Sequence, residues 1–258
     1  MIHLNENFFV LKNRVLFYTI ALVAFFPLTK INAQDVERSK DVQIQSALLN
    51  TVAIYDKQLS RNTMVYTGRS YFDENSNVQG HQFFMDDYWE QGSVKYDDNR
   101  YDSIFLMYDI HRDLLLIENF NVDGFLSPII LFKDKIESFE LMGHHFVRLE
   151  RDSMSNLKEG FYDLMFKGNE NQVLVKRRKE IVNSNEINTI REMFTEKDRY
   201  YIKKGDIYFQ VKKRKSVLKV LSDHKKEVKS YIKKSGIQFT NQPDINLVEV
   251  VKYYESLP

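Results

Sequence analysis

The chain has 258 residues, with 37 Lys and Arg against 36 Asp and Glu, and it has no Cys. Without Cys there is no disulfide, no thiol catalysis, no Cys-ligated metal and no lipid attached through a Cys. The 19 Phe and 15 Tyr, with only nine Gly and four Pro, are typical of a globular protein rather than of a disordered chain.

The N-terminus has the pattern of a secretory signal. Lys12 and Arg14 supply positive charge, and residues 15–29 (VLFYTIALVAFFPLT) supply an apolar segment. The small residue Ala33 then offers a cleavage site before Gln34. The pattern predicts export to the periplasm or out of the cell.

An uncleaved anchor helix is the alternative to cleavage. Ile31 is not the small residue preferred three positions before the cut, which favours the anchor. Pro27 interrupts a continuous helix, which favours cleavage. We therefore expect residues 1–33 to be removed. No later window is apolar for long enough to span a bilayer, so no transmembrane segment is expected after removal of the signal.

Residues 34–62 are predicted to form an amphipathic helix. Apolar residues recur there at spacings of three and four, which places them on one side of a helix, and polar residues occupy the other side. The apolar side contains Ile44, Ala47, Leu48, Val52, Tyr55 and Leu59.

Residues 63–213 change to the pattern of a long antiparallel meander. Short runs of Val, Ile, Phe, Tyr and Leu are separated by polar turns such as DDNR, KDK and KGD, and turns this short join antiparallel neighbours. Within the meander, residues 183–195 are expected to form a short helix with Ile187, Ile190 and Phe194 on one side. The predicted class is α+β and mainly antiparallel β, with an open or half-barrel-like sheet.

The stretch VKYDDNRYDSIFLMYDI (residues 94–110) contains three Tyr-Asp pairs and raises the question of an acidic site. Side chains alternate between the two sides of a strand, so Asp102 and Asp109 should lie on opposite sides, about 20 Å apart. Such a separation excludes a shared carboxylate pair. Asp97 fits a hairpin turn, and Asp113 fits the next turn. These acids are interpreted as turn and strand-end residues.

The segment GHQFFMDDYWEQGSV (residues 80–94) concentrates aromatic residues just before a predicted strand. Phe83, Phe84, Tyr88 and Trp89 could line a ligand cavity or a protein interface. The alternative is a loop that folds over one end of the sheet and closes the core. These four are the candidate ligand-binding residues of the sequence.

Catalytic, metal and cofactor motifs are absent from the sequence. His144 and His145 are adjacent and would point to opposite sides of a strand, while His81 and His111 lie near Asp residues at spacings that match no metal motif. There is no G-x-S-x-G and no Gly-rich phosphate loop. We predict no catalytic residue, no metal and no cofactor. A pair of carboxylates needs no motif and stays possible among the 36 acidic residues.

The charges are unevenly distributed. Residues 34–174 carry 24 acidic against 14 basic side chains, whereas residues 203–234 carry 12 basic against three acidic. Such a basic segment can bind phosphate-bearing partners, pack beside acidic parts of the chain or face solvent. Because the chain is expected to leave the cytoplasm, no nucleic acid is expected as a partner. An anionic surface of the cell envelope, or solvent, is the better match.

Residues 216–258 are predicted to form a helical hairpin. Ser222 or Asp223 could cap the first helix, Gly236 would end it, and Pro243 suits the first turn of the second helix. The apolar sides of the two helices contain Val228, Tyr231, Ile232, Leu247, Val250, Val251, Tyr254 and Leu257.

Several stretches together resemble a group of exported proteins of Bacteroidetes-type bacteria. They are the NAQ end of the signal, YTGRSY followed by WEQGSVKYD, YDIHRDLLLI, and the tail SVLKVLSDHKKEVKSYIKKSGIQF with its Tyr-rich last helix. These are packing and turn patterns, and no activity is assigned to the group. The resemblance implies export and a single domain over residues 34–258, and it adds no functional residue.

Two functions follow as hypotheses. The first is an exported, non-enzymatic protein of the cell envelope that binds a partner or a small apolar ligand through an aromatic-rich surface of its sheet. A sharper form resembles the periplasmic lipoprotein carriers, in which a half-barrel sheet wraps a helix and shelters lipid in a dry cavity. The alternative is an exported hydrolase of envelope or dietary polymers, which predicts a cleft with two or more carboxylates of shifted pKa.

Overall fold

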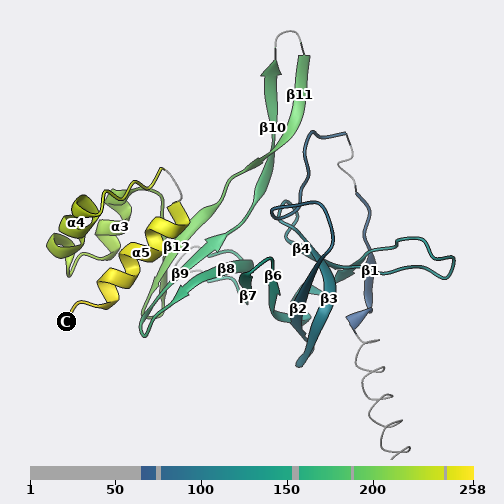
Figure 1. Cartoon of the computed structure of the whole chain (residues 1–258), viewed down its shortest axis with the longest axis horizontal. Coiled ribbons are helices and arrows are strands. Elements are labelled where there is room, and N and C mark those ends of the chain that lie inside the picture. Colours follow the sequence, from purple (N-terminus) through teal and green to yellow (C-terminus); the bar gives the residue numbers. More distant parts are fainter. Residues whose placement is uncertain (1–64, 74–76, 153–156, 187–188, 241–242) are drawn as a thin grey trace, which may run out of the picture. The chain divides into compact units, whose positions relative to one another are not determined.

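The computed structural model describes residues 65–73, 77–152, 157–186, 189–240 and 243–258. The predicted signal (1–33) and the predicted amphipathic helix (34–62) lie outside the described residues. All described residues belong to one compact unit, Gln58–Pro258. They are mainly antiparallel β with three helices near the C-terminus, which confirms the predicted fold class at that level (Figure 1).

The described residues contain an eleven-stranded antiparallel sheet. Its spatial order is β1-β5-β4-β3-β2-β6-β7-β8-β9-β12-β13. The strands are β1 (Gly68–Ser70), β2 (Glu90–Tyr96), β3 (Asn99–Asp109), β4 (Leu114–Ile117), β5 (Ile129–Leu131), β6 (Ile136–Leu141), β7 (His144–Leu149), β8 (Gly160–Lys167), β9 (Asn171–Lys176), β12 (Arg199–Lys204) and β13 (Ile207–Val211).

The strand order departs from a continuous meander in the first half of the sheet, where β1 pairs with β5 rather than with β2. β2 to β5 follow one another in space, but β6 does not pair with β5; it pairs with the free side of β2. The prediction of one continuous meander is wrong here, because the short link between β5 and β6 looks like a turn between neighbours. This link forms the 3₁₀ turn η1 (Lys133–Lys135), which leads away from β5 to the free side of β2. At that side, the carbonyl of Lys135 accepts a hydrogen bond from the amide of Asp97 at 2.9 Å.

The sheet curls strongly between β3 and β8. In a flat sheet these two strands would lie about 19 Å apart, because four inter-strand spacings separate them in the strand order. The rings of Tyr108 on β3 and Phe161 on β8 are nevertheless 5.9 Å apart between centroids. The strands between them must therefore bend around a common interior.

Aromatic rings fill that interior. Tyr108, Phe139, Phe146 and Phe161 are each at most 1% exposed, and neighbouring ring centroids lie 4.6–5.9 Å apart. Most of these pairs are edge-to-face, the arrangement that the ring quadrupole favours. The curled strands enclose a close-packed core.

The alternation of side chains between the two sides of the sheet is interrupted in β3 at Ser103. Ser103 has a φ of 57°, and the pairing with β2 shifts register between Gly92 and Ser93, so β3 contains a bulge. Tyr101 therefore enters the same core as Tyr108. As a result, the prediction that Asp102 and Asp109 lie on opposite sides is wrong, although each binds its own Arg and they form no pair.

The C-terminal region contains three helices rather than the two predicted. They are α3 (Arg214–Val220), α4 (Lys225–Lys234) and α5 (Pro243–Glu255), and their apolar sides pack on Val173, Ile202 and Val211 of the sheet. Gly236, with a φ of 67°, follows α4 as expected. Asp223 does not cap α4; its carboxylate accepts hydrogen bonds from Lys204 and from the Tyr254 hydroxyl. Of the helices described, none combines the length and apolar character that a membrane crossing requires.

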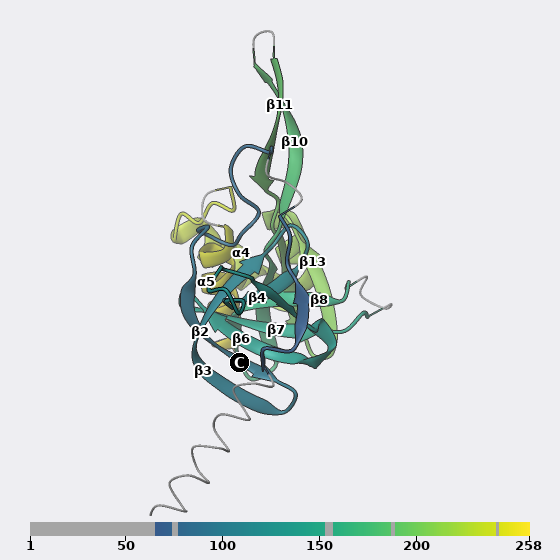
Figure 2. The same ribbon diagram turned by 90° about the vertical axis from the view of Figure 1, so that its right-hand side faces the viewer.

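A two-stranded arm leaves the sheet between β9 and β12 (Figures 1 and 2). Its strands are β10 (Lys179–Glu186) and β11 (Thr189–Glu196), so the helix predicted at 183–195 is wrong. The apolar spacing there fits a helix, but pairing with β10 and with residue 79 decides otherwise. The carbonyl of Gln79 accepts a hydrogen bond from the amide of Phe194 at 3.0 Å.

Candidate functional site

Phe83 and Phe84 belong to a short extended segment that packs beside β3. The amide of Phe84 donates to the carbonyl of Tyr108 at 2.8 Å, and the amide of Ile110 donates to the carbonyl of Gln82 at 3.1 Å. Phe84 is only 6% exposed, and its ring meets that of Phe146 edge-on at 5.2 Å. Phe84 therefore closes one end of the aromatic core, as the alternative interpretation of this segment expects.

Tyr88 and Trp89 lie in a different environment. The chain turns at Met85, whose φ is 55°, and then reaches Tyr88, which is 51% exposed. The Tyr88 hydroxyl donates to Asp86 at 3.0 Å, and Trp89 is half-buried. The structure thus does not bring the four predicted residues together on one surface, since one is in the core and one faces water.

Three ion clusters hold the buried carboxylates. In the first, Arg177 binds Asp163 at 2.8 Å, Asp198 at 2.9 Å and Asp244 at 3.0 Å, and His144 lies 2.7 Å from Asp163. Burial alone would lower the pKa of Arg177, but the carboxylates of Asp163 and Asp198 outweigh it and raise the pKa. The pKa of Asp198 is raised, mainly by burial.

The second cluster surrounds Asp113 in the β3–β4 turn. Its carboxylate accepts hydrogen bonds from Lys133 at 2.8 Å, Lys176 at 2.6 Å and the Tyr108 hydroxyl at 2.6 Å. Burial acts to raise the pKa of Asp113, but the two Lys outweigh it and lower the pKa. Burial lowers the pKa of Lys176. The cluster fastens the β3–β4 turn to β8 and β9, where Gly160 leaves room for it.

The third cluster surrounds Asp109, which is fully buried. Its carboxylate accepts hydrogen bonds from the Arg112 side chain at 2.8 Å, the Tyr71 hydroxyl at 3.1 Å and the backbone amides of His111 and Arg112. Four donors on one carboxylate satisfy it completely, which is how a buried charge is tolerated. The cluster therefore has a structural role.

A polar groove of about 610 Å³ crosses β2, β3 and the β6–β7 turn. Arg100 binds Asp102 at 2.8 Å, Glu140 at 3.3 Å and the Ser93 hydroxyl at 3.0 Å, so both carboxylates are joined to one cation. His145 lies 3.8 Å from Glu140. No group of metal-binding side chains occurs in the part of the chain that the structure describes.

The link between β4 and β5 carries an exposed apolar surface that the sequence did not reveal. We call it the apolar tip and define it by Phe120 (57% exposed), Val122 (102%), Phe125 (70%) and Leu126 (50%). These residues alternate with Asn, Asp and Gly in NFNVDGFL, which reads as an ordinary turn. The signal in the sequence that could have identified this surface is the presence of large apolar residues within a turn.

Hydrogen bonds fix the shape of the apolar tip. The Asn121 side-chain oxygen accepts from the amides of Asp123 at 3.0 Å and Phe125 at 2.9 Å, and the Asn121 amide donates to the Phe125 carbonyl at 2.9 Å. At the base of the loop, the amide of Ser127 donates to the carbonyl of Asn119 at 2.7 Å. The loop is therefore an ordered hairpin held by its own hydrogen bonds.

The buried carboxylates described above are each neutralised by a cation, whereas the apolar tip presents large side chains to water. No protein-family model, curated protein or solved structure matches the chain.

Proposed function

We propose that the protein is an exported, non-enzymatic component of the cell envelope that binds a partner protein through its apolar tip. The observation that carries the proposal is the exposure of four large apolar side chains on a hydrogen-bonded hairpin. Burying one such side chain stabilises a complex by about 1.5–3 kcal/mol. Clustered exposed apolar side chains are a mark of interaction surfaces.

The order of the hairpin supports recognition. Because Asn121 already holds the loop in one shape, a partner that binds it loses less conformational entropy than one that must order a loose loop. Phe120 and Phe125 are aromatic residues of the kind enriched at interface cores. The tip fits a partner with an apolar pocket into which a hairpin can insert.

A partner protein has more support than a small apolar ligand. The rings inside the curled sheet pack against one another, which opposes the lipid-carrier form of the hypothesis in the described part of the chain. The Asp123 carboxylate between the apolar residues suits a protein pocket with a polar rim better than a lipid interior. Export is supported by the apolar N-terminal segment with its positive flank.

The hydrolase alternative has less support from the structure. Asp113 and Asp198, two partly buried carboxylates with shifted pKa, are bound to Lys and Arg inside ion clusters. Asp102 and Glu140, which share the polar groove, are both bound to Arg100. Each of these carboxylates is bound by a cation of the same chain, which counts against a role in hydrolysis.

Site-specific photo-crosslinking tests the proposal. A benzophenone amino acid replaces Phe125 in the full chain, which is produced in cells with an intact envelope. The control carries the same replacement at Phe209 on β13, which is another exposed Phe (36%) but lies outside the apolar tip. We expect a discrete crosslinked envelope protein from position 125 only. Identical patterns from both positions, or no crosslink at position 125, would contradict the proposal.

The captured protein then provides the quantitative test. Its dissociation constant is measured with the wild-type chain and with the variant Phe125→Ser, Leu126→Ser. Interface hot spots cost about 2 kcal/mol or more when truncated, so we expect binding at least about 30-fold weaker. Unchanged affinity would show that the tip is not the binding surface.

A further inference from the structure

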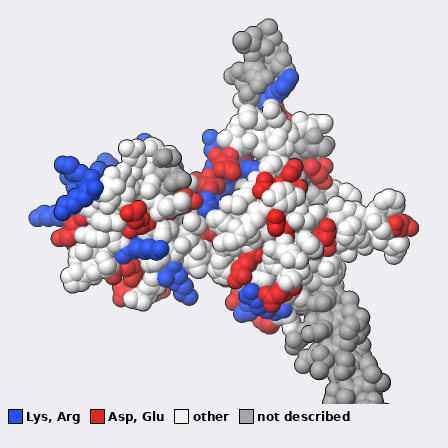
Figure 3. Space-filling model, viewed as in Figure 1, with Lys and Arg blue, Asp and Glu red and all other residues white. Residues whose placement is uncertain are grey.

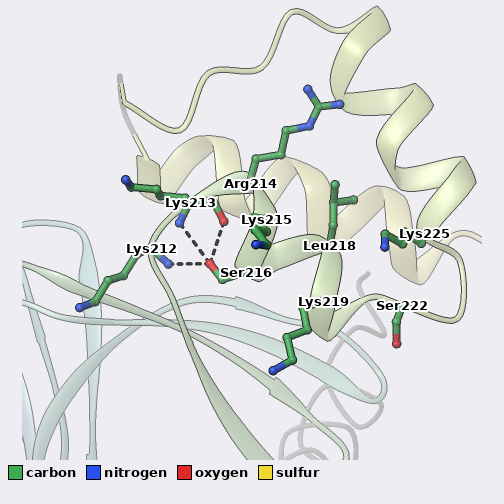
Figure 4. Close-up of a pocket in the computed structure, with 9 residues that line it drawn as sticks. All are labelled: Lys212, Lys213, Arg214, Lys215, Ser216, Leu218, Lys219, Ser222 and Lys225. Atoms are coloured by element: carbon green, nitrogen blue, oxygen red, sulfur yellow. Dashed lines mark hydrogen bonds between the residues drawn. The ribbon is translucent and has the colours of Figure 1, made fainter.

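The basic C-terminal segment forms a groove beside α3 that has no place in the proposed function. Figure 4 shows its lining, which includes one Leu and six cations, and the groove holds about 1100 Å³. We call it the basic groove. The cations are Lys212, Lys213, Arg214, Lys215, Lys219 and Lys225.

The cations of the basic groove differ from those of the ion clusters, because no residue that the structure describes supplies them with an acidic partner. Lys133 and Lys176 bind Asp113, and Arg177 binds three Asp. In contrast, the five Lys of the basic groove form no ion pair with any residue that the structure describes, and all five are exposed. In Figure 3, blue side chains gather at the α4 end of the helical part.

Neighbouring groups keep the groove positive. Asp223 is the carboxylate nearest in sequence to α3, but its oxygens bind Lys204 and the Tyr254 hydroxyl instead. The guanidinium of Arg214 donates to the carbonyl of Lys229, which fixes it against α4. No acidic residue that the structure describes therefore neutralises the positive charges of the groove.

The backbone that carries these Lys is held in place. The Ser216 hydroxyl oxygen accepts hydrogen bonds from the amides of Lys212 at 2.9 Å and Lys213 at 3.1 Å, and its proton is donated to the Lys213 carbonyl at 2.7 Å (Figure 4). These bonds join the end of β13 to the first turn of α3. Leu218, 8% exposed, forms the apolar floor of the groove.

The character of the side chains indicates which anion they meet. A site for one small anion uses rigid, partly buried donors, whereas exposed Lys are mobile point charges on flexible stems. Single-stranded nucleic acid is bound with aromatic side chains on which bases stack, and none of the described residues that line the groove is aromatic. Clustered exposed Lys are the pattern of segments attracted to anionic lipid surfaces.

We propose that the basic groove docks the protein on a membrane surface that contains anionic phospholipid. The Lys ammonium groups meet the phosphates of the head groups, and no part of the described chain needs to enter the bilayer. The contact is electrostatic, so it weakens as salt shortens the range of the attraction. It is separate from the apolar tip, so either proposal can fail without the other.

Vesicle co-sedimentation tests the docking. The full chain is mixed with vesicles of phosphatidylcholine alone or with about one third phosphatidylglycerol. For each variant, the partition coefficient on the vesicles with phosphatidylglycerol is divided by that on phosphatidylcholine alone. Because the apolar N-terminal segment is present in every sample, this ratio isolates the contribution of lipid charge. The groove variant carries Lys212→Gln, Lys215→Gln and Lys219→Gln. The control variant removes the same charge from exposed Lys outside the basic C-terminal segment, through Lys158→Gln, Lys167→Gln and Lys197→Gln.

Each Lys near an anionic membrane contributes about fivefold to partitioning, so the groove variant should lose about 100-fold of the phosphatidylglycerol-dependent binding. The control variant should stay within about threefold of wild type, and raising salt to about 1 M should abolish the difference between vesicles. Equal losses in the two variants, equal binding to both kinds of vesicle, or tighter groove-dependent binding to a single-stranded oligonucleotide would overturn the proposal. Melting temperatures of both variants confirm that they are folded.

Discussion

Glu255, the last residue of α5, accepts two hydrogen bonds from Asn171 at the start of β9. The Asn171 amide lies 2.7 Å and its side-chain Nδ2 lies 2.6 Å from the same carboxylate oxygen. The amides of Asn169 and Glu170 donate to the same carboxylate at 3.3 and 3.4 Å. Burial acts to raise the pKa of Glu255, but these donors outweigh it and lower the pKa. One side chain thus fastens the last helix to the β8–β9 turn.

The substitution Glu255→Ala should destabilise the protein. It removes a charged acceptor from several backbone amides, and a hydrogen bond to a charged group contributes about 1.5–3 kcal/mol net to stability. We expect the free energy of unfolding to fall by about 2 kcal/mol, measured by urea denaturation. Glu227→Ala, at an exposed position of α4, is the control and should change it by less than about 0.5 kcal/mol. Equal losses would contradict the anchoring role.

Gly160→Ala should be far more costly than Gly143→Ala. Both residues have positive φ, 148° and 79° respectively. A Cβ on Gly160 would lie 2.3 Å from an oxygen of Asp113 and 2.5 Å from the nitrogen of Lys176, whereas one on Gly143 would meet nothing within 4 Å.

For Gly143→Ala we expect only the conformational cost, about 1 kcal/mol. For Gly160→Ala we expect about 3 kcal/mol or more, because the ion cluster must also shift. Thermal and urea denaturation measure both values. If the Gly160 variant were as stable as the Gly143 variant, the Asp113 cluster could rearrange around the new Cβ without a loss of stability.

Phe84→Ala and Tyr88→Ala should separate the two parts of the aromatic segment. Phe84 is buried against Phe146, and truncation of a buried Phe costs about 3–5 kcal/mol. Tyr88 is half-exposed, so its truncation should cost less than about 1 kcal/mol. The midpoint of urea unfolding reports both. Similar midpoints for the two variants would be inconsistent with the packing described here.

The Asp223 carboxylate should make stability depend on pH in the acid range. Burial acts to raise its pKa, but Lys204 and Tyr254 outweigh it and lower the pKa from 3.8 to about 2. A lowered pKa means that its contribution is present above pH 3.8 and is lost as the pH falls towards 2. The side chain is 48% exposed, so the contribution is below about 1 kcal/mol.

The test compares melting temperatures of wild type and Asp223→Asn across this pH range. Wild type should melt higher at neutral pH, and the two proteins should converge in acid. Asp206→Asn, at an exposed position of the β12–β13 turn, should show no such convergence. A difference that persists at the lowest pH would rule out the carboxylate as its source.

Local signals in the sequence predicted local features well. Gly236 follows α4 and Pro243 begins α5 because a helix end that needs positive φ and a first turn that needs no amide are chemical requirements of single residues. The turn at Asp97 forms for the same reason, with a φ of 51°. Alternating apolar residues were enough to identify most of the strands.

Features decided by distant contacts were not predictable from the sequence. Phe194 has helical spacing with Ile187 and Ile190, but its strand is fixed by residue 79, more than a hundred positions away. The aromatic segment was found, but its division into core and surface depends on Phe146, which no local pattern connects to Phe84. The apolar tip was missed because its residues sit among turn-forming neighbours.

The arm formed by β10 and β11 has a consequence for how this fold can vary. The amide of Lys197 donates to the carbonyl of Arg178 at the base of the arm, so the chain enters and leaves it at adjacent points. β9 and β12 pair directly beyond that base, from Lys176 and Arg199 onwards. Lengthening the arm by one residue pair would extend its reach by about 3.4 Å without changing the register of the sheet. The length of the arm can therefore change in evolution without a change in the strand pairing of the sheet.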